Sequence, residues 1–318
     1  MATSVLGLKT FAASDPVDYN EINDNYNKID NGVKTAMQGR AAYNLLDNSD
    51  FANPVNQRGR SGTYEGVSNY TTFVIDRWKT WSTGCTYTLS SAGLQIANLN
   101  ASSSDGPWEG LPNPERMKGK TYTLAVGYNG GNVACGNVAV PTGTLTEDKY
   151  LSAVSTSGTR PGVRFVIAST YSSIDFQILI SAGQTVTVEW AALYEGSYTA
   201  DTLPAYVPKG YAAELAECQR YYYQSWNGSE FNKGYITREA ISASSLALIE
   251  FPIEMRIVPT ITFYTAANET GVVKEWTTNS SVSATQNYTS TKAFGVSGGG
   301  NFTIGKTYYF HYSASADL

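Results

Sequence analysis

The sequence predicts a mainly β protein with a short N-terminal helix, a central β-sandwich or jelly roll, and a C-terminal β-rich tip domain. Three observations support this prediction. The clearest helical repeat lies near the N-terminus, short alternating runs separated by turn residues fill the rest, and a proline- and glycine-rich stretch divides them. We expect residues 1–43 to form an attachment segment and helix, 44–202 the sandwich, 203–210 a linker, and 211–318 the tip domain.

The composition is that of a β-rich protein with few charges. Of the 318 residues, 15% are charged, whereas tyrosine (23) and glycine (29) are abundant. A soluble domain usually has roughly 25% charged residues, and aromatic residues suit sheet surfaces. The net charge is −5 and the basic residues are dispersed. The sequence therefore predicts no nucleic-acid partner.

Apolar residues recur at alternating steps of three and four between Val17 and Met37. They are Tyr19, Ile22, Tyr26, Ile29, Val33 and Ala36. This spacing is that of a coiled-coil seam, and isoleucine at d positions favours three or more strands. The helix could instead pack on its own domain, but a helix of about 20 residues is marginal alone. Because Asn25 and Asn27 are weak helix formers, we favour stabilisation from outside, in an oligomeric neck.

Alternation of apolar and polar residues predicts the strands of the sandwich. The clearest runs are residues 122–126, 174–180 and 186–190. Asn129-Gly130-Gly131 is typical of a hairpin turn. Trp78 and Trp190 stand in strand-like runs, so we expect both in the core.

The linker is followed by a predicted helix from Ala212 to Tyr222, with Leu215, Cys218 and Tyr222 on one face. The last hundred residues return to alternating runs. The strongest strand predictions there are residues 246–251, 260–264 and 307–312.

Few residues suited to catalysis or metal binding are present. Cys85, Cys135 and Cys218 are odd in number and widely spaced, so we expect free thiols. The single histidine, His311, stands among aromatic residues and is predicted to lie on a strand face. No nucleotide-binding, hydrolase or metalloprotease motif occurs. We therefore predict a protein that is not an enzyme, with no catalytic residue, metal or cofactor.

Glycoside cleavage needs only two carboxylates. Asp105 and Glu109 flank Trp108, but their glycine and proline neighbours are typical of an ordinary loop. We expect no catalysis there.

The N-terminus lacks a basic region followed by a long apolar run, and no stretch approaches the length of a membrane span. We therefore expect synthesis in a cytoplasm and no membrane insertion. Function outside the cell would then require release without secretion, for example virion assembly followed by lysis.

Four aromatic residues in polar surroundings are candidates for sugar binding. They are Trp226, Trp276, Tyr288 and Trp108. Flat rings suit the C–H faces of sugars, and the neighbouring hydroxyl and amide groups can bind sugar hydroxyls. Each ring could instead pack on its own sheet. We expect at least one ring of the C-terminal domain to contact a glycan.

Several short segments resemble phage and prophage tail-fibre proteins that carry a carbohydrate-binding-like β-sandwich. They are residues 19–30 (YNEINDNYNKID), 44–51 (NLLDNSDF), 53–59 (NPVNQRG), 75–78 (IDRW), 190–196 (WAALYEG), 206–208 (YVP) and 214–222 (ELAECQRYY). The resemblance covers roughly residues 16–223. It implies a homotrimer, a location in the virion and adhesion to a host cell surface, and it supplies no binding residues.

The resulting hypothesis is a receptor-binding fibre protein, made in the host cytoplasm, that binds a bacterial surface glycan for phage adsorption. Residues 1–40 would attach it to a tail, baseplate or capsid protein. The alternatives are a purely structural head or tail decoration fibre, a short capsular polysaccharide depolymerase, and a binding module detached from a cellular enzyme.

Overall fold

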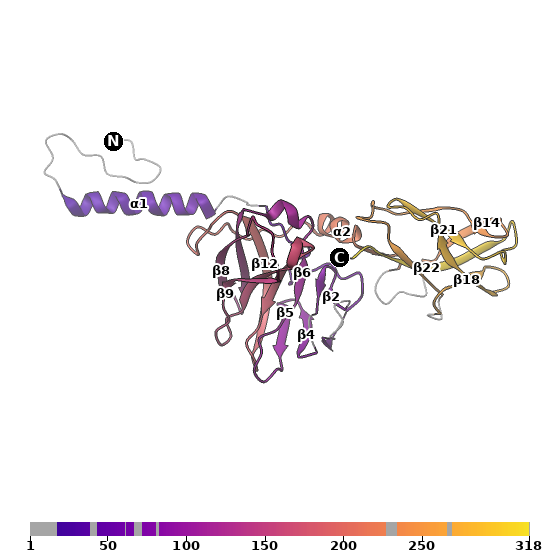
Figure 1. The fold of residues 1–318 in the computed structure, drawn as a ribbon, viewed down its shortest axis with the longest axis horizontal. Helices are drawn as coiled ribbons and strands as arrows, with labels where there is room; N and C mark the ends of the chain where they lie inside the picture. Colours follow the sequence, from indigo (N-terminus) through magenta and orange to yellow (C-terminus); the bar gives the residue numbers. More distant parts are fainter. Residues whose placement is uncertain are drawn as a thin grey trace.

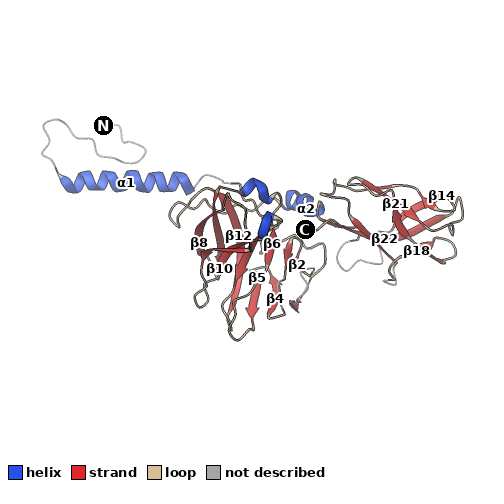
Figure 2. Cartoon of the chain, in the orientation of Figure 1, coloured by secondary structure: helices blue, strands red, loops and turns tan. Residues whose placement is uncertain are grey.

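The computed structural model describes residues 18–38, 43–60, 62–66, 72–80, 83–226, 234–265 and 269–317. The chain is mainly β, as the sequence predicts, with two α-helices. Helix α1 lies at one end, a two-sheet sandwich in the middle, and a second β domain at the other end (Figures 1 and 2).

Helix α1 (Tyr19–Gln38) confirms the predicted N-terminal helix. The Asp18 carboxylate accepts the N–H of Asn20 at 2.8 Å, so Asp18 caps the first turn. Tyr19, Tyr26 and Ile29 of the predicted seam are exposed, and Ile22 is half-buried. This half of the helix therefore does not pack its apolar stripe on its own domain. The side chains of Val33 and Ala36 lie outside what the structure describes.

The sandwich consists of two antiparallel six-stranded sheets. In spatial order, the first contains β1 (Thr63–Glu65), β4 (Cys85–Ser90), β5 (Gly93–Asn98), β12 (Thr185–Glu195), β7 (Thr121–Tyr128) and β8 (Asn132–Ala139). The second contains β2 (Phe73–Ile75), β3 (Trp78–Lys79), β6 (Trp108–Gly110), β11 (Ile174–Leu179), β10 (Gly162–Ile167) and β9 (Lys149–Val154). The 3₁₀ turns η1 (Pro114–Met117) and η2 (Ser169–Tyr171) lie between strands.

Both sheets contribute to one apolar core, which makes them two layers of a single unit. Tyr122 of the first sheet packs edge-on against Phe165 of the second, with ring centroids 6.1 Å apart. Trp78 is fully buried, as predicted, and contacts Phe51 and Phe176. Burial of such side chains contributes roughly 1.5–3 kcal/mol each.

Trp190 is not in this core, contrary to the prediction. The register of β12 shifts between Val188 and Trp190, so strict alternation breaks there. Ala191 and Leu193 face the core instead. The Trp190 ring lies half-buried on the outer face of the sheet and stacks on Tyr206 of the linker, with centroids 4.8 Å apart.

This outer face holds the linker in place. Leu203 joins Ala125, Ala192 and Tyr194 in a small apolar cluster. Gly127 lies under the Trp190 indole, and a Cβ atom at that position would collide with the ring. The linker is therefore fixed to the sandwich rather than running freely through solvent.

Helix α2 (Tyr211–Gln219) follows the linker. It ends before the predicted Tyr222, which starts strand β13 (Tyr222–Gln224). Its buried face carries Glu214 and Cys218, whereas Leu215 is only half-buried. The prediction of an apolar face is therefore partly wrong. Glu214 is buried on this side of the helix, where the periodicity predicts Leu215.

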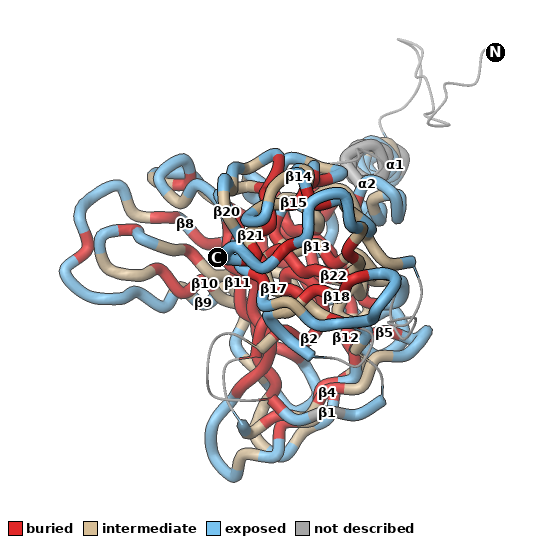
Figure 3. The backbone as a smooth tube through the Cα atoms, turned by 90° about the vertical axis from the view of Figure 1, so that its right-hand side faces the viewer, coloured by how far each residue is buried: buried red, intermediate tan, exposed pale blue. Residues whose placement is uncertain are grey.

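The C-terminal domain is a single ten-stranded antiparallel arrangement around β22 (Thr307–Ser315). Its other strands are β13, β14 (Ile236–Ser242), β15 (Ser245–Leu246), β16 (Ile249–Glu250), β17 (Thr260–Tyr264), β18 (Val272–Glu275), β19 (Ser281–Ser283), β20 (Thr285–Asn287) and β21 (Ala293–Ser297). Four of them pair with β22 itself: β13, β14, β17 and β18. The predicted strands at 260–264 and 307–312 are confirmed, and the run at 246–251 is split between β15 and β16. Buried stretches follow the strands, and exposed turns join them (Figure 3).

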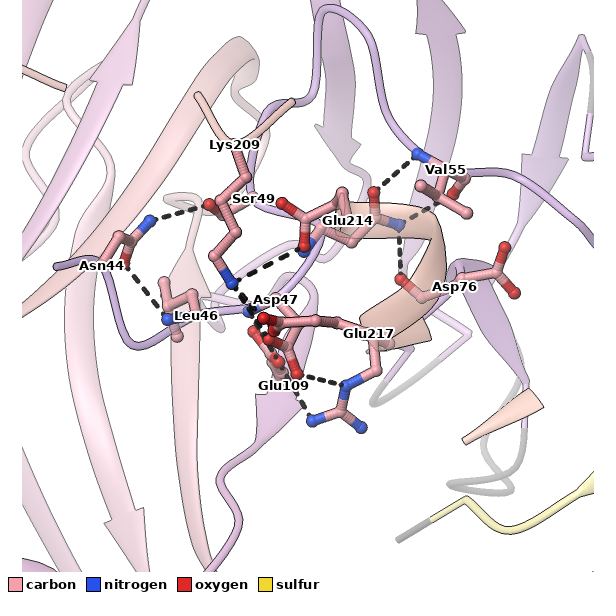
Figure 4. A network of polar contacts seen from close by, with 12 residues as sticks. Asn44, Leu46, Asp47, Ser49, Val55, Asp76, Glu109, Lys209, Glu214 and Glu217 are labelled. Carbon is pink, nitrogen blue, oxygen red and sulfur yellow. Dashed lines mark hydrogen bonds and ion pairs between the residues drawn. The ribbon is translucent and has the colours of Figure 1, made fainter. Parts of the chain in front are cut away.

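A buried polar network joins the sandwich to α2 (Figure 4). The Arg77 guanidinium lies between Asp47 and Glu109, with its nitrogens 3.2 and 3.1 Å from the carboxylate oxygens. It also donates to the carbonyl of Gly110 at 2.8 Å and lies 3.5 Å from the centre of the Tyr221 ring. All members come from segments far apart in sequence, so the network forms only when the whole sandwich and α2 are in place.

The protonation of this network follows from its burial and charges. Burial would raise the pKa of Asp47, but a hydrogen bond with Glu217 and the charges of Arg77 and Lys209 bring it below its ordinary value. Burial raises the pKa of Glu109 well above its ordinary value, despite Arg77. The Arg77 guanidinium therefore contacts one carboxyl group that favours its charged form, Asp47, and a second, Glu109, whose charged form is disfavoured by burial.

A second link runs from Arg58 to the C-terminus. Arg58 lies 3.3 Å from Asp76 and 2.7 Å from Asp317. Its guanidinium stacks between the rings of Phe73 and Tyr222, at 3.8 and 3.6 Å. The residues that follow β22 of the C-terminal domain (the distal domain) are thereby tied to the sandwich through Arg58.

Arg77→Ala should destabilise the protein strongly, because it leaves Glu109 buried without its cation and Asp47 with Lys209 alone. We expect a loss of about 3–5 kcal/mol in the free energy of unfolding, measured by chemical denaturation. Lys120→Ala, which breaks the exposed Lys120–Glu195 pair, is the control and should change stability little. Equal midpoints for the wild type and Arg77→Ala would contradict this role for Arg77.

Asp76 should make stability depend on pH. Burial raises the pKa of Asp76 to about 6, from 3.8. The folded state favours the protonated form of Asp76. The stability that this preference contributes is therefore fully present below the ordinary pKa of 3.8 and is lost as pH rises through about 6. Relative to Asp76→Asn, the wild type should lose up to about 3 kcal/mol of stability between about pH 4 and about pH 7.

Denaturation series at several pH values test this. The exposed substitution Glu147→Gln serves as a control that should leave the pH profile of the wild type unchanged. A wild type and an Asp76→Asn variant with parallel profiles would refute the assignment to Asp76.

Candidate functional site

The outer face of the C-terminal sheet carries a continuous row of rings along β22. Side chains alternate between faces on a strand, so Phe310 and Tyr312 enter the core while Tyr309 and His311 point to the other side. The strands that flank β22 each add a ring near one end. We call this set the aromatic strip. In order, it consists of Tyr264, Trp226, His311, Tyr235, Tyr309 and Trp276.

Neighbouring rings in the strip are in van der Waals contact. Successive ring centroids are 5.3, 5.6, 4.7, 5.1 and 5.5 Å apart. Their planes are tilted or edge-on, which is the arrangement that aromatic pairs prefer. Trp276 is 59% exposed, and His311 is fully buried beneath its neighbours. The strip therefore contains one fully buried ring, His311, among rings that solvent can reach.

Polar groups fix the rings and line their edges. Ser225 Oγ accepts the N–H of Tyr312 at 2.9 Å and lies 3.1 Å from His311 Nδ1. The Tyr309 hydroxyl donates to Asn279 at 2.5 Å, and the Tyr264 hydroxyl lies 3.3 Å from Ser313 Oγ. Hydroxyl and amide groups thus accompany the rings, while the ion pair of Lys274 with Glu269 lies near one end of the strip.

The structure brings two of the predicted ligand-binding residues into this strip, Trp226 and Trp276. It separates the third, Tyr288, which is 82% exposed in the turn after β20 and has φ of 48°. Among the described residues, no ring contact joins Tyr288 to the strip.

The fourth candidate, Trp108, lies on the sandwich. Its indole is 8% exposed and donates to the carbonyl of Thr80 at 3.2 Å. Strand alternation places Glu109 on the opposite face, in the core beside Arg77. Asp105 is buried in its loop and accepts the N–H of Gly106. The carboxylates that flank Trp108 in sequence are therefore not arranged as a pair around it.

Several strip residues escaped the sequence analysis. Tyr264 and Tyr309 stand in strand-like runs, the sequence around Tyr235 gives no distinguishing signal, and the sequence predicts His311 only as an ordinary strand-face residue. Each ring of the flanking strands is distant in sequence from β22. The pairing of four separate strands with β22 brings them together, and no local pattern carries that information.

Other reactive groups of the described chain are unremarkable in geometry. All three cysteines are free, as predicted, and burial raises the pKa of Cys85 to about 12. In the described ranges, no group of histidine, cysteine and acidic residues is arranged to hold a metal ion. Nor does any described helix have the length and apolar character needed to cross a membrane.

Comparisons with protein-family models, with curated proteins and with solved structures each found no match to this chain.

Proposed function

We propose that this protein is a homotrimeric virion fibre protein that binds a bacterial surface glycan through the aromatic strip, for phage adsorption. The observation that carries the proposal is the strip itself. It presents accessible rings side by side with hydroxyl and amide groups, and sugars offer the matching C–H faces and hydroxyls. The ring-rich polar segments of the C-terminal domain support glycan binding, and the resemblance of roughly residues 16–223 to tail-fibre proteins supports a place in the virion.

The trimer is supported by α1. Tyr19, Tyr26 and Ile29 leave an apolar stripe exposed in the single chain, and such a stripe is stabilised when it packs against copies of itself. Three copies would present three strips on one particle. Weak single contacts then gain apparent affinity through effective concentration.

The attachment of residues 1–40 to a tail, baseplate or capsid protein belongs to the same proposal. Helix α1 and the C-terminal domain that carries the strip lie at opposite ends of the molecule (Figure 1). An adhesin anchored by its N-terminus would therefore expose the strip to the host.

The mass of the full chain in solution tests the trimer. We expect about three times 34.4 kDa by light scattering. The double variant Ile22→Asp and Ile29→Asp should fall to the monomer mass, because it places charges in the seam. Asn27→Asp, on the same helix but outside the seam, should remain trimeric. A monomeric wild type would contradict the fibre proposal and favour a detached binding module.

Substitutions in the strip test glycan binding by the full-length protein. Trp276→Ala removes an exposed ring, so the fold should survive while adsorption to host cells or binding to a glycan array weakens at least tenfold. Tyr288→Ala is the matched control, since it removes an equally exposed ring outside the strip.

Normal binding by Trp276→Ala with loss in Tyr288→Ala would move the site away from the strip. Arrays that remain blank for the wild type would favour a structural decoration fibre. Release of reducing sugar from host polysaccharide would favour a depolymerase.

A further inference from the structure

A cavity of about 610 Å³ lies at the boundary between the sandwich and the distal domain. One side is the outer face of the second sheet, where Trp108 and Asp175 flank the bare backbone of Gly110. The turn η1 contributes Arg116, and the distal domain contributes Arg256. The cavity belongs to neither the core nor the aromatic strip.

The walls of this cavity are rigidly built. Lys118 lies 2.7 Å from Glu115 and 4.2 Å from the centre of the Tyr171 ring, so it ties η1 to the turn at η2. The Tyr171 hydroxyl donates to the carbonyl of Pro141. Asn113, Thr170 and Tyr171 have φ of 55°, 63° and 56°. Asparagine tolerates this left-handed conformation, but it is costly for a β-branched or bulky residue such as Thr170 or Tyr171, and such strain tends to be kept where a site needs it.

Its charges are not balanced from within the chain. Glu115 is paired with Lys118, but neither Arg116 nor Arg256 forms an ion pair with a carboxylate of the described chain. The Nε of Arg256 is buried and has no hydrogen-bond acceptor among the described residues. The facing carboxyl, Asp175, is half-buried, and burial raises its pKa to about 7. Arg116 and Arg256 are therefore two guanidinium groups of the lining without a carboxylate partner in the described chain.

We propose that this cavity binds a carboxylate-bearing sugar of the hexuronic acid type. Arg116 and Arg256 both line the cavity, and arginine binds a carboxylate through parallel N–H donors. The part of the Trp108 indole that lines the cavity gives the sugar ring an apolar surface. Asp175 and the hydroxyls of Ser172 and Ser173 bind its hydroxyl groups. A cavity with mainly apolar walls and a few convergent polar groups is typical of a small-ligand site.

Titration of the full-length protein with sodium glucuronate, followed by NMR, tests this proposal. Glucose is the matched neutral probe. Glucuronate should shift signals of the cavity residues in a saturable way, and glucose should bind at least tenfold more weakly. Arg116→Gln should weaken glucuronate binding at least tenfold. Arg160→Gln, an exposed substitution in the turn at 157–160, should leave it unchanged.

Equal binding of glucose and glucuronate, or no saturable shift with either, would overturn the proposal. So would inorganic phosphate that binds as tightly as glucuronate, because the cavity would then be a simple anion site. A glucuronate-containing oligosaccharide is the last probe. A site for the units of a polysaccharide should bind it at least as tightly as free glucuronate, whereas a site limited to the free sugar acid should not bind it.

The cavity does not depend on the aromatic strip. Trp276→Ala should therefore retain glucuronate binding even where it loses adsorption. Loss of glucuronate binding in Trp276→Ala, with the fold intact, would contradict a separate site.

Discussion

The arrangement of the chain depends on one buried guanidinium. Arg77 neutralises Asp47 and Glu109 while its flat face contacts Tyr221. Arginine suits this position because its planar fork can hold two carboxylates and stack on a ring at once. Around it, Asn48 accepts the N–H of Val55 and donates to the carbonyls of Val55 and Asp76, and its own N–H is accepted by Glu214. Most members share partners with one another, so the loss of one side chain weakens the contacts of several others and the network holds together as a unit.

The network also draws together several of the short segments singled out from the sequence. Residues 44–51, 53–59, 75–78 and 214–222 supply nearly all of its members. These segments are scattered along the sequence and meet at the junction of the sandwich with α2. Polar residues in strand-like surroundings are unusual unless their partners are fixed. The motifs therefore have a structural reason to occur together, whatever the protein binds.

The sequence predicts elements better than it predicts sites. Alternation located β7, β11, β17 and β22, and the three-four spacing located α1, because those periods are local. It failed at Trp190, where a register shift reverses the alternation. It failed at α2, where Glu214 is buried by a partner more than a hundred residues away. The same limit hid Tyr235 and Tyr309 of the strip, because strand pairing brings them together over long separations in sequence.

The path of the last strand has a mechanical consequence. The distal domain begins at β13, beside α2, and β22 returns to the same place, where Ala316 donates to the carbonyl of Tyr221 and Asp317 binds Arg58 (Figure 1). Entry and exit of the domain are thus adjacent. A force on the far end of the C-terminal domain is shared by the two chain segments that cross the junction, at β13 and after β22. It therefore does not separate the strands of the sheet one after another from an unattached end. A peptide segment that continues the chain beyond Asp317 would likewise leave from the middle of the molecule and keep the far surface of the C-terminal domain uncovered.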